Sequence, residues 1–468
     1  MLLRLLLSPP LAIARLGSSE TQLECFHWGA NDDRPRGTGK TTVVPGETLR
    51  VAEDGTVTAY VPSAVQFKDG DSYRPVCPFF ELHGEWEDGP RTRTGPVTRK
   101  VLKAHGLTAA KLLWTVRAGN LKAFHMTRDP GTRIDAHEEI HGDQVRPVEL
   151  RGVSSARAKK SLVPVGHYIP LGSVRLTQPT DEFPEFRLRF TPAKGRFYGP
   201  PDLRKVWNVD IPESQLFLNP ESSWVGFIPA LSDLRTSPEY LYAGEGSETR
   251  ASYGVVDDVC NAIITCSVPG SKIAPAVARV TVSPPDYAPD RRHLITIADA
   301  LKDYTDRAEV WDPTFYSSTE TAAEIQDLFE RILETMWLTN VDVFNNRVDV
   351  QENPARAFAL GIPYKSTDHY SFPPQPAIAG QNFPISDRGR QFHRRMVAIE
   401  VLRDLLRERP ELLEKWIRPP GGNNGFFTSQ MPPVMRDSSG GPLHLSRRQY
   451  DLLLNWAASV RIGIEEES

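Results

Sequence analysis

The stretch AVARVTV at residues 276–282 decides the fold class, because it is almost entirely apolar and rich in β-branched residues. A run of this kind is typical of a strand in the interior of a β-sheet. It leads into SPPDYAPD at residues 283–290, whose prolines and aspartates predict a turn-rich loop.

The sequence before this strand repeats the same pattern of short β-prone runs separated by Gly, Pro and Asp. Clear examples are GTVTAYVPSAVQF at 55–67, KLLWTVRAG at 111–119 and EFRLRF at 185–190. The last alternates apolar and charged residues, as a half-exposed strand does. We therefore predict that residues 1–300 form a β-rich portion.

Beyond about residue 300 the apolar spacing becomes helical. Residues 319–337 and 387–407 each carry one apolar stripe, and a further helix is predicted to start at Ser446. Thr321 with Glu324, and Ser446 with Gln449, have the spacing of capping boxes. The predicted fold class is α+β, in which a β-rich portion (1–300) packs on a mainly helical portion (301–468).

The N-terminal sequence MLLRLLLSPPLAIARLG is apolar, but Arg4, Pro9 and Pro10 interrupt it. This pattern favours a buried first strand at residues 5–13 over a secretory signal peptide. No apolar run approaches the roughly 18 residues of a membrane-spanning helix. These features predict a cytoplasmic protein without a membrane partner.

Charge and cysteine content exclude several classes of protein. The net charge is −4 with both signs mixed along the chain, and there is no basic stripe to predict nucleic-acid binding. The four cysteines match no zinc or redox spacing. Cys260 and Cys266, six residues apart, are predicted to lie on one face of a strand as buried free thiols.

HEEIH at residues 137–141 fits the zinc-protease pattern, which requires both histidines on one face of a helix. Pro and Gly flank the motif closely, so no helix is predicted there. We interpret His137, Glu138 and His141 as a chance match and predict no metal site.

RGTGKTT at residues 36–42 is similar to a phosphate-binding loop. However, Arg34 stands where the first glycine of that loop is needed, so we predict a turn before the TTVV strand. Neither a G-x-S-x-G elbow nor a G-x-G-x-x-G motif after a strand is present, so hydrolase and dinucleotide-binding functions have no support.

Four blocks, in order, resemble one family, the LodA-like lysine ε-oxidases and glycine oxidases. They are PPLAIARLGSS at 9–19, FKDGDSYRPVCPFFELHG at 67–84, the region 257–290 with VARVTVSPPDYAPD, and MPPVMRDSSGGPLHLSRRQYDLLLNWA at 431–457. The second and third blocks depart from the family pattern. Tyr73-Arg74-Pro75 replaces a basic K-R-Q, and Cys260 to Ile263 replaces an S-D-G-P turn.

The resemblance implies a cysteine tryptophylquinone cofactor, which accepts electrons from an amine through a Schiff base. In the family a further C-terminal segment carries the cofactor Cys and Trp, whereas this sequence ends at Ser468 with no Cys beyond Cys266. We expect a truncated homologue with no cofactor in this chain, and Trp456 is not expected to be a cofactor precursor.

Two functions stay open at this point, with a zinc enzyme as a distant third. The first is the scaffold of an amino-acid oxidase that is completed by a second polypeptide. The second is a non-catalytic homologue, a pseudoenzyme that acts in binding or assembly or as a homo-oligomer. A surviving substrate pocket is expected near Tyr253, Asp257, Asp258 and Tyr287. The two carboxylates would there bind an amino group or hold a turn.

Overall fold

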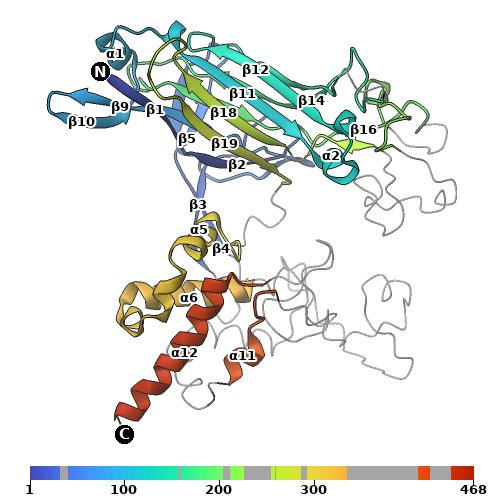
Figure 1. Ribbon diagram of the computed structural model, residues 1–468. Helices are drawn as coiled ribbons and strands as arrows, with labels where there is room; N and C mark the ends of the chain where they lie inside the picture. The colour runs from blue at the N-terminus through green and yellow to red at the C-terminus, as the bar shows by residue number, and fades with distance from the viewer. Residues whose placement is uncertain are drawn as a thin grey trace, which may run out of the picture. The chain divides into compact units, whose positions relative to one another are not determined.

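The computed structural model describes residues 1–31, 41–155, 160–203, 211–225, 254–258, 260–285, 292–334, 409, 411–421 and 444–467. The chain divides into two compact units (Figure 1). Unit 1 comprises residues 1–26 and 45–287, and unit 2 comprises residues 27–44 and 288–468.

Unit 1 is built on two β-sheets. The strands of the first sheet are β1 (Leu2–Ser8), β9 (Phe79–Asp88), β10 (Arg91–Pro96), β13 (Val148–Gly152), β14 (Ile169–Leu176) and β15 (Arg187–Thr191). The second sheet has the order β12 (Ile134–His141), β11 (Leu113–Asn120), β18 (Asn261–Ser267), β19 (Ala276–Ser283) and β2 (Leu11–Arg15). All the pairings in the two sheets are antiparallel except that of β19 with β2.

Short elements complete unit 1. The two-stranded sheets pair β5 (Thr48–Val51) with β6 (Val57–Tyr60), β7 (Lys68–Asp69) with β8 (Ser72–Tyr73), and β16 (Phe197–Tyr198) with β17 (Val255–Val256). The helices are α1 (Arg99–Ala104) and α2 (Lys122–Thr127), with 3₁₀ helices η1 (Ala109–Lys111), η2 (Pro130–Thr132) and η3 (Glu213–Gln215).

One hydrophobic core joins the two large sheets. Leu82, Leu171 and Phe190 from the first sheet and Trp114 and Ile264 from the second belong to the same buried cluster. β15, β18 and β19 bury alternate residues, as strands of a sheet with one packed face do. The prediction of a β-rich N-terminal portion is confirmed for the described residues, while its boundary at residue 300 stays a prediction. β19 lies between two strands, as its composition predicts.

The prediction of one first strand at residues 5–13 is wrong. The chain forms β1 in the first sheet, breaks at Pro9 and Pro10, and continues as β2 in the second sheet. Proline has no backbone N–H to donate to a β-ladder, so two in succession end one strand before the next begins.

In unit 2 the described part is mainly helical. It contains α5 (Ile297–Thr305), α6 (Thr319–Glu334), α11 (Leu412–Trp416) and α12 (Arg447–Glu467), with 3₁₀ helices η5 (Arg307–Trp311) and η6 (Pro313–Ser317). β3 (Phe26–Asn31) pairs with β4 (Thr41–Pro45). A second core includes Val310, Phe329, Leu453 and Trp456. The helix predicted at 387–407 lies outside the described residues, and the packing of the helical portion on the β-rich portion stays a prediction.

One of the two predicted capping boxes is confirmed. At α12 the backbone N of Ser446 donates to Gln449 Oε1 at 3.0 Å, and the backbone N of Gln449 donates to Ser446 Oγ at 3.2 Å. At α6 the prediction is wrong, because Ser318 rather than Thr321 is the cap. Ser318 Oγ accepts from the Thr321 backbone N at 3.0 Å, while the Thr321 hydroxyl donates to the Phe315 carbonyl at 2.6 Å.

Candidate functional site

The predicted pocket residues Asp257 and Asp258 follow directly after β17, and both are buried. Asp257 Oδ1 accepts a hydrogen bond from the backbone N of Arg196 at 2.6 Å. Burial raises the pKa of Asp257 to about 7, against the opposing effect of the backbone N–H groups of Arg196 and Gly195. Asp257 therefore holds two chain segments together.

Asp258 contacts a side chain from a distant part of unit 1. Lys122 Nζ, at the start of α2, donates to Asp258 Oδ2 at 2.6 Å. The second oxygen, Oδ1, is buried and has no hydrogen-bond partner in the described part of the chain. Tyr253 and Tyr287 lie outside the described residues, so the structure brings together only the two carboxylates of the predicted site.

The raised pKa of Asp257 predicts a pH-dependent stability. In the unfolded chain this pKa is about 3.9, so between about pH 4 and pH 7 the folded state binds more protons than the unfolded state. The free energy of unfolding should then fall as pH rises through this window. We expect Asp257→Asn, which keeps an acceptor oxygen, to remove this loss, which amounts to about 4 kcal/mol across the window. Urea unfolding of the wild type and Asp257→Asn across this pH window measures the free energy of unfolding of each. Parallel pH profiles of the two proteins would contradict the prediction.

The HEEIH residues lie on strand β12. Because side chains alternate along a strand, His137 and His141 share its exposed face about 13 Å apart, while Glu138 points to the opposite face. Two zinc ligands and a general base need the one-turn spacing of a helix. Within the described residues, no three metal-ligating side chains gather closely enough to hold an ion.

We expect tag-free protein to contain substoichiometric zinc, and His137→Ala to leave its metal content unchanged. The extended geometry of β12 is the reason, since one ion cannot reach both imidazoles. Elemental analysis by plasma mass spectrometry measures the content. One zinc per chain that disappears in His137→Ala would contradict the prediction.

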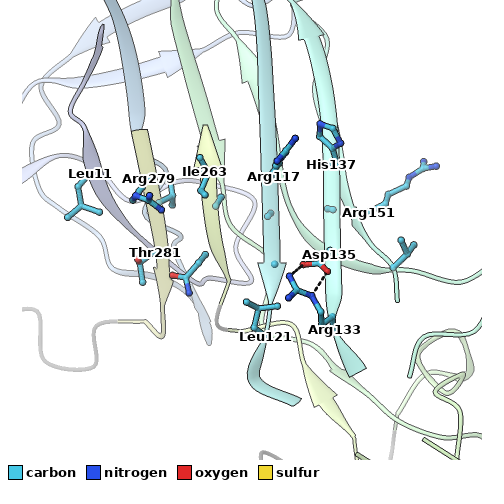
Figure 2. A pocket seen from close by; sticks show the side chains of 17 residues that line it. Leu11, Arg117, Leu121, Arg133, Asp135, His137, Arg151, Ile263, Arg279 and Thr281 are labelled. Carbon is cyan, nitrogen blue, oxygen red and sulfur yellow. Dashed lines mark hydrogen bonds and ion pairs between the residues drawn. The ribbon is translucent and has the colours of Figure 1, made fainter. Parts of the chain in front are cut away.

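A groove of about 790 Å³ lies on the open face of the second sheet (Figure 2). Among the described residues, its lining includes four arginines, Arg117, Arg133, Arg151 and Arg279, but only one carboxylate, Asp135. Arg133 Nε contacts that carboxylate at 2.9 Å, and Arg151 Nε contacts Glu149 at 3.1 Å. This groove is therefore strongly basic in a chain whose net charge is negative.

The strand register explains how the groove forms. Arg117 on β11 lies opposite Ile263 on β18, which lies opposite Arg279 on β19, which lies opposite Leu11 on β2. These residues form one row across the sheet, and all four are exposed. On the other side of β11, His137 continues the row opposite Arg117.

Sequence reasoning did not identify Arg117 or Arg279 as candidate site residues. A signal was present, because each is the single charged residue within a mainly apolar run, at 112–119 and 276–282. Alternation alone predicts that such a residue points to solvent. Their proximity depends on pairing between strands about 150 residues apart, which no local pattern contains.

The structure also places one cysteine beside a tryptophan. Cys266 on β18 lies directly opposite Trp114 on β11, and both are fully buried in the core of unit 1. Cys260, directly before β18, is buried as well, so the prediction of two buried free thiols is confirmed, whereas only Cys266 lies within the strand. Burial raises the pKa of both thiols. An amine substrate has no access to this pair, so these residues do not fit a tryptophylquinone cofactor.

None of the helices in the described part of the chain combines the length and apolarity that crossing a membrane requires. No protein-family model and no curated protein sequence matches this chain. Three solved structures of L-Lys epsilon-oxidase from Marinomonas mediterranea are similar to it, one of them the Schiff base intermediate with L-Lys.

The sequence identity to these three structures is 13–14%, and the TM-scores are 0.44–0.46. The matches cover 97% of this chain and 61% of the oxidase chain, so this chain spans less than two thirds of their length. Membership in the LodA-like family stays a prediction.

Proposed function

We propose that this chain is the scaffold part of a LodA-like amino-acid or amine oxidase. By itself it is inactive, and a second polypeptide supplies the quinone-bearing segment from outside these 468 residues. In this proposal the helical portion packs on the β-rich portion, and the assembly works in the cytoplasm. The protein part of such an enzyme binds and orients its cofactor, which carries out the oxidation.

The observation that carries this proposal is the convergence of three of the four family-like blocks within unit 1. β2, from the first block, pairs in parallel with β19, from the third block. Arg15, also from the first block, exchanges backbone hydrogen bonds with Val76 of the second block at 3.1 and 3.3 Å. Segments that resemble one family and lie far apart in sequence therefore form one continuous structure.

Side-chain contacts also join these three blocks. Ser19 Oγ donates to Asp69 Oδ2 at 2.5 Å, which links the first block to the second. Arg15 Nη1 donates to the Pro284 carbonyl at 3.2 Å, which links the first block to the loop of the third. A shared architecture is expected to keep such block-to-block contacts even where the surrounding sequence has changed.

The test combines native mass spectrometry of the protein from its own source with an assay for peroxide release. We expect a complex with a second polypeptide that stains for a bound quinone and releases hydrogen peroxide from an amino acid. The 52.4 kDa chain by itself should release none. Peroxide release by the isolated chain, or a quinone-free homo-oligomer from the source, would contradict the proposal.

The alternative is a non-catalytic homologue that acts in binding or assembly. The basic groove on the second sheet favours it, because that groove is a concave surface with charged groups and no redox chemistry of its own. A homo-oligomer without quinone in the same experiment would support this alternative. A quinone-containing complex would exclude it.

A further inference from the structure

Two guanidinium groups in the groove have no partner in the described part of the chain. No ion pair or side-chain hydrogen bond joins Arg117 or Arg279 to another described residue, in contrast to Arg133 and Arg151 at the groove's margin. Arg133 also stacks on the Phe124 ring at 5.1 Å, and Arg151 on the Tyr168 ring at 5.0 Å. The marginal arginines are thus held in place, whereas the two central ones remain available.

The sheet places these two groups at a fixed spacing. Arg117 and Arg279 lie on strands β11 and β19, separated only by β18, so their Cα atoms are about 10 Å apart. Both side chains leave the same face of the sheet, one on each side of Ile263 (Figure 2). Two long basic side chains on either side of one apolar side chain form a clamp for two anionic groups joined by an apolar linker.

The groove also favours a negatively charged ligand over a neutral one. Asp135 is the sole carboxylate in the lining, and Arg133 already neutralises it. Glu139 is exposed on the same face of β12 but does not line the groove. Hydrogen bonds between a guanidinium and a carboxylate or phosphate are roughly twice as strong as neutral ones.

The size of the groove indicates a small molecule. Its volume of about 790 Å³ lies within the range of small-ligand sites. A stable protein partner would cover roughly 800 Å² of each surface, beyond the extent of one such row of side chains. Leu11, Leu121, Ile263 and Val153 supply apolar surface for the body of the ligand.

We propose that this groove binds a small organic dianion, such as a dicarboxylate, with one anionic group on Arg117, the other on Arg279 and the linker over Ile263. This inference does not depend on the oxidase-scaffold proposal, because none of its residues is assigned to redox chemistry. It assigns a binding site to the open face of the second sheet.

Isothermal titration calorimetry of the full chain with glutarate, in a low-salt buffer free of phosphate, tests the site. We expect a Kd on the order of 0.1 mM, and no binding of the uncharged analogue glutaramide. Arg117→Ala and Arg279→Ala should each weaken binding about tenfold. Arg91→Ala, an exposed arginine on β10 outside the groove, is the matched control and should bind as the wild type does. Raising the salt concentration should also weaken binding, because these groups are exposed and screened.

Three outcomes would overturn the proposal. The first is the absence of glutarate binding at millimolar concentration in the wild type. The second is a failure of specificity, seen either as equal affinity for glutarate and glutaramide or as unchanged glutarate affinity in both arginine variants. The third is far tighter binding of a polyglutamate peptide than of glutarate, lost in the same variants, which would assign the groove to an acidic protein segment. Circular dichroism confirms that the variants fold, since both positions are on the surface.

Discussion

The Gly17→Ala variant is expected to lose about 3 kcal/mol of the free energy of unfolding of unit 1, because the new methyl group overlaps backbone atoms. A Cβ atom at this position would lie 2.7 Å from the carbonyl carbon of Arg74 and even closer to Pro75 N and Tyr73 O. These three nearest atoms all belong to the backbone of residues 73–75, so no flexible side chain can move aside. Gly17 belongs to the first family-like block and these neighbours to the second, so the glycine permits their close approach.

Urea unfolding followed by hydrogen–deuterium exchange of peptides from β1 and β9 measures this loss for unit 1. Gly95→Ala is the matched control. A Cβ there meets only a Trp86 ring atom at 3.4 Å, so little change is expected. Equal stability of Gly17→Ala and Gly95→Ala would contradict the inference that the close approach of the two blocks requires a glycine at position 17.

The Arg448→Met variant is expected to lose about 3 kcal/mol in unit 2, because the buried guanidinium contacts two carboxylates and a backbone carbonyl and all three contacts are lost. The Arg448 side chain is 3% exposed, and its Nη1 contacts Glu324 Oε1 at 2.6 Å. Its Nε donates to the Asp306 carbonyl at 3.3 Å, and Nη2 contacts Glu309 at 3.5 Å. The Glu324 contact raises the pKa of Arg448 despite the opposing effect of burial. This arginine therefore connects α12 to α6 and η5.

Arg307→Met serves as the control for Arg448→Met. Arg307 pairs with Asp303 four residues earlier at 2.6 Å, but its side chain is 52% exposed, so we expect a loss below about 0.5 kcal/mol. Exchange rates of α6 and α12 amides report on unit 2 in both variants. The double variant Arg448→Met with Glu324→Leu should recover part of the loss, since Glu324 would otherwise keep, among the described residues, only its longer contact with Lys302 at 3.5 Å. Equal losses in Arg448→Met and Arg307→Met would contradict the assigned role.

Several predictions from sequence were correct because they depend on neighbours within a few residues. The alternation in EFRLRF predicts the half-buried pattern of β15. Ser446 and Gln449 form the predicted capping box, since both partners lie within one helical turn. The predicted strand TTVV appears as β4, while the turn before it lies outside the described residues.

Predictions that depended on choosing between equivalent local partners were less successful. Ser318 and Thr321 are both good caps, and the Phe315 carbonyl accepts the Thr321 hydroxyl, which leaves Ser318 as the cap of α6. The apolar run at the N-terminus has the pattern of one strand, but it forms two, β1 in the first sheet and β2 in the second. The substrate-binding role of Asp257 and Asp258 stays a prediction, and their partners Arg196 and Lys122 come from distant segments that no local pattern identifies.

The sequence by itself determined the β-rich and helical portions, the alternation of strands such as β15, and the burial of the thiols of Cys260 and Cys266. Each of these follows from the periodicity and side-chain chemistry of a short segment. The tertiary structure decided which strands became neighbours, and so it placed Arg117 and Arg279 on either side of Ile263 and extended HEEIH along an edge strand. Strand register is set by pairing between segments that are far apart in the chain, and a single segment does not specify its partner.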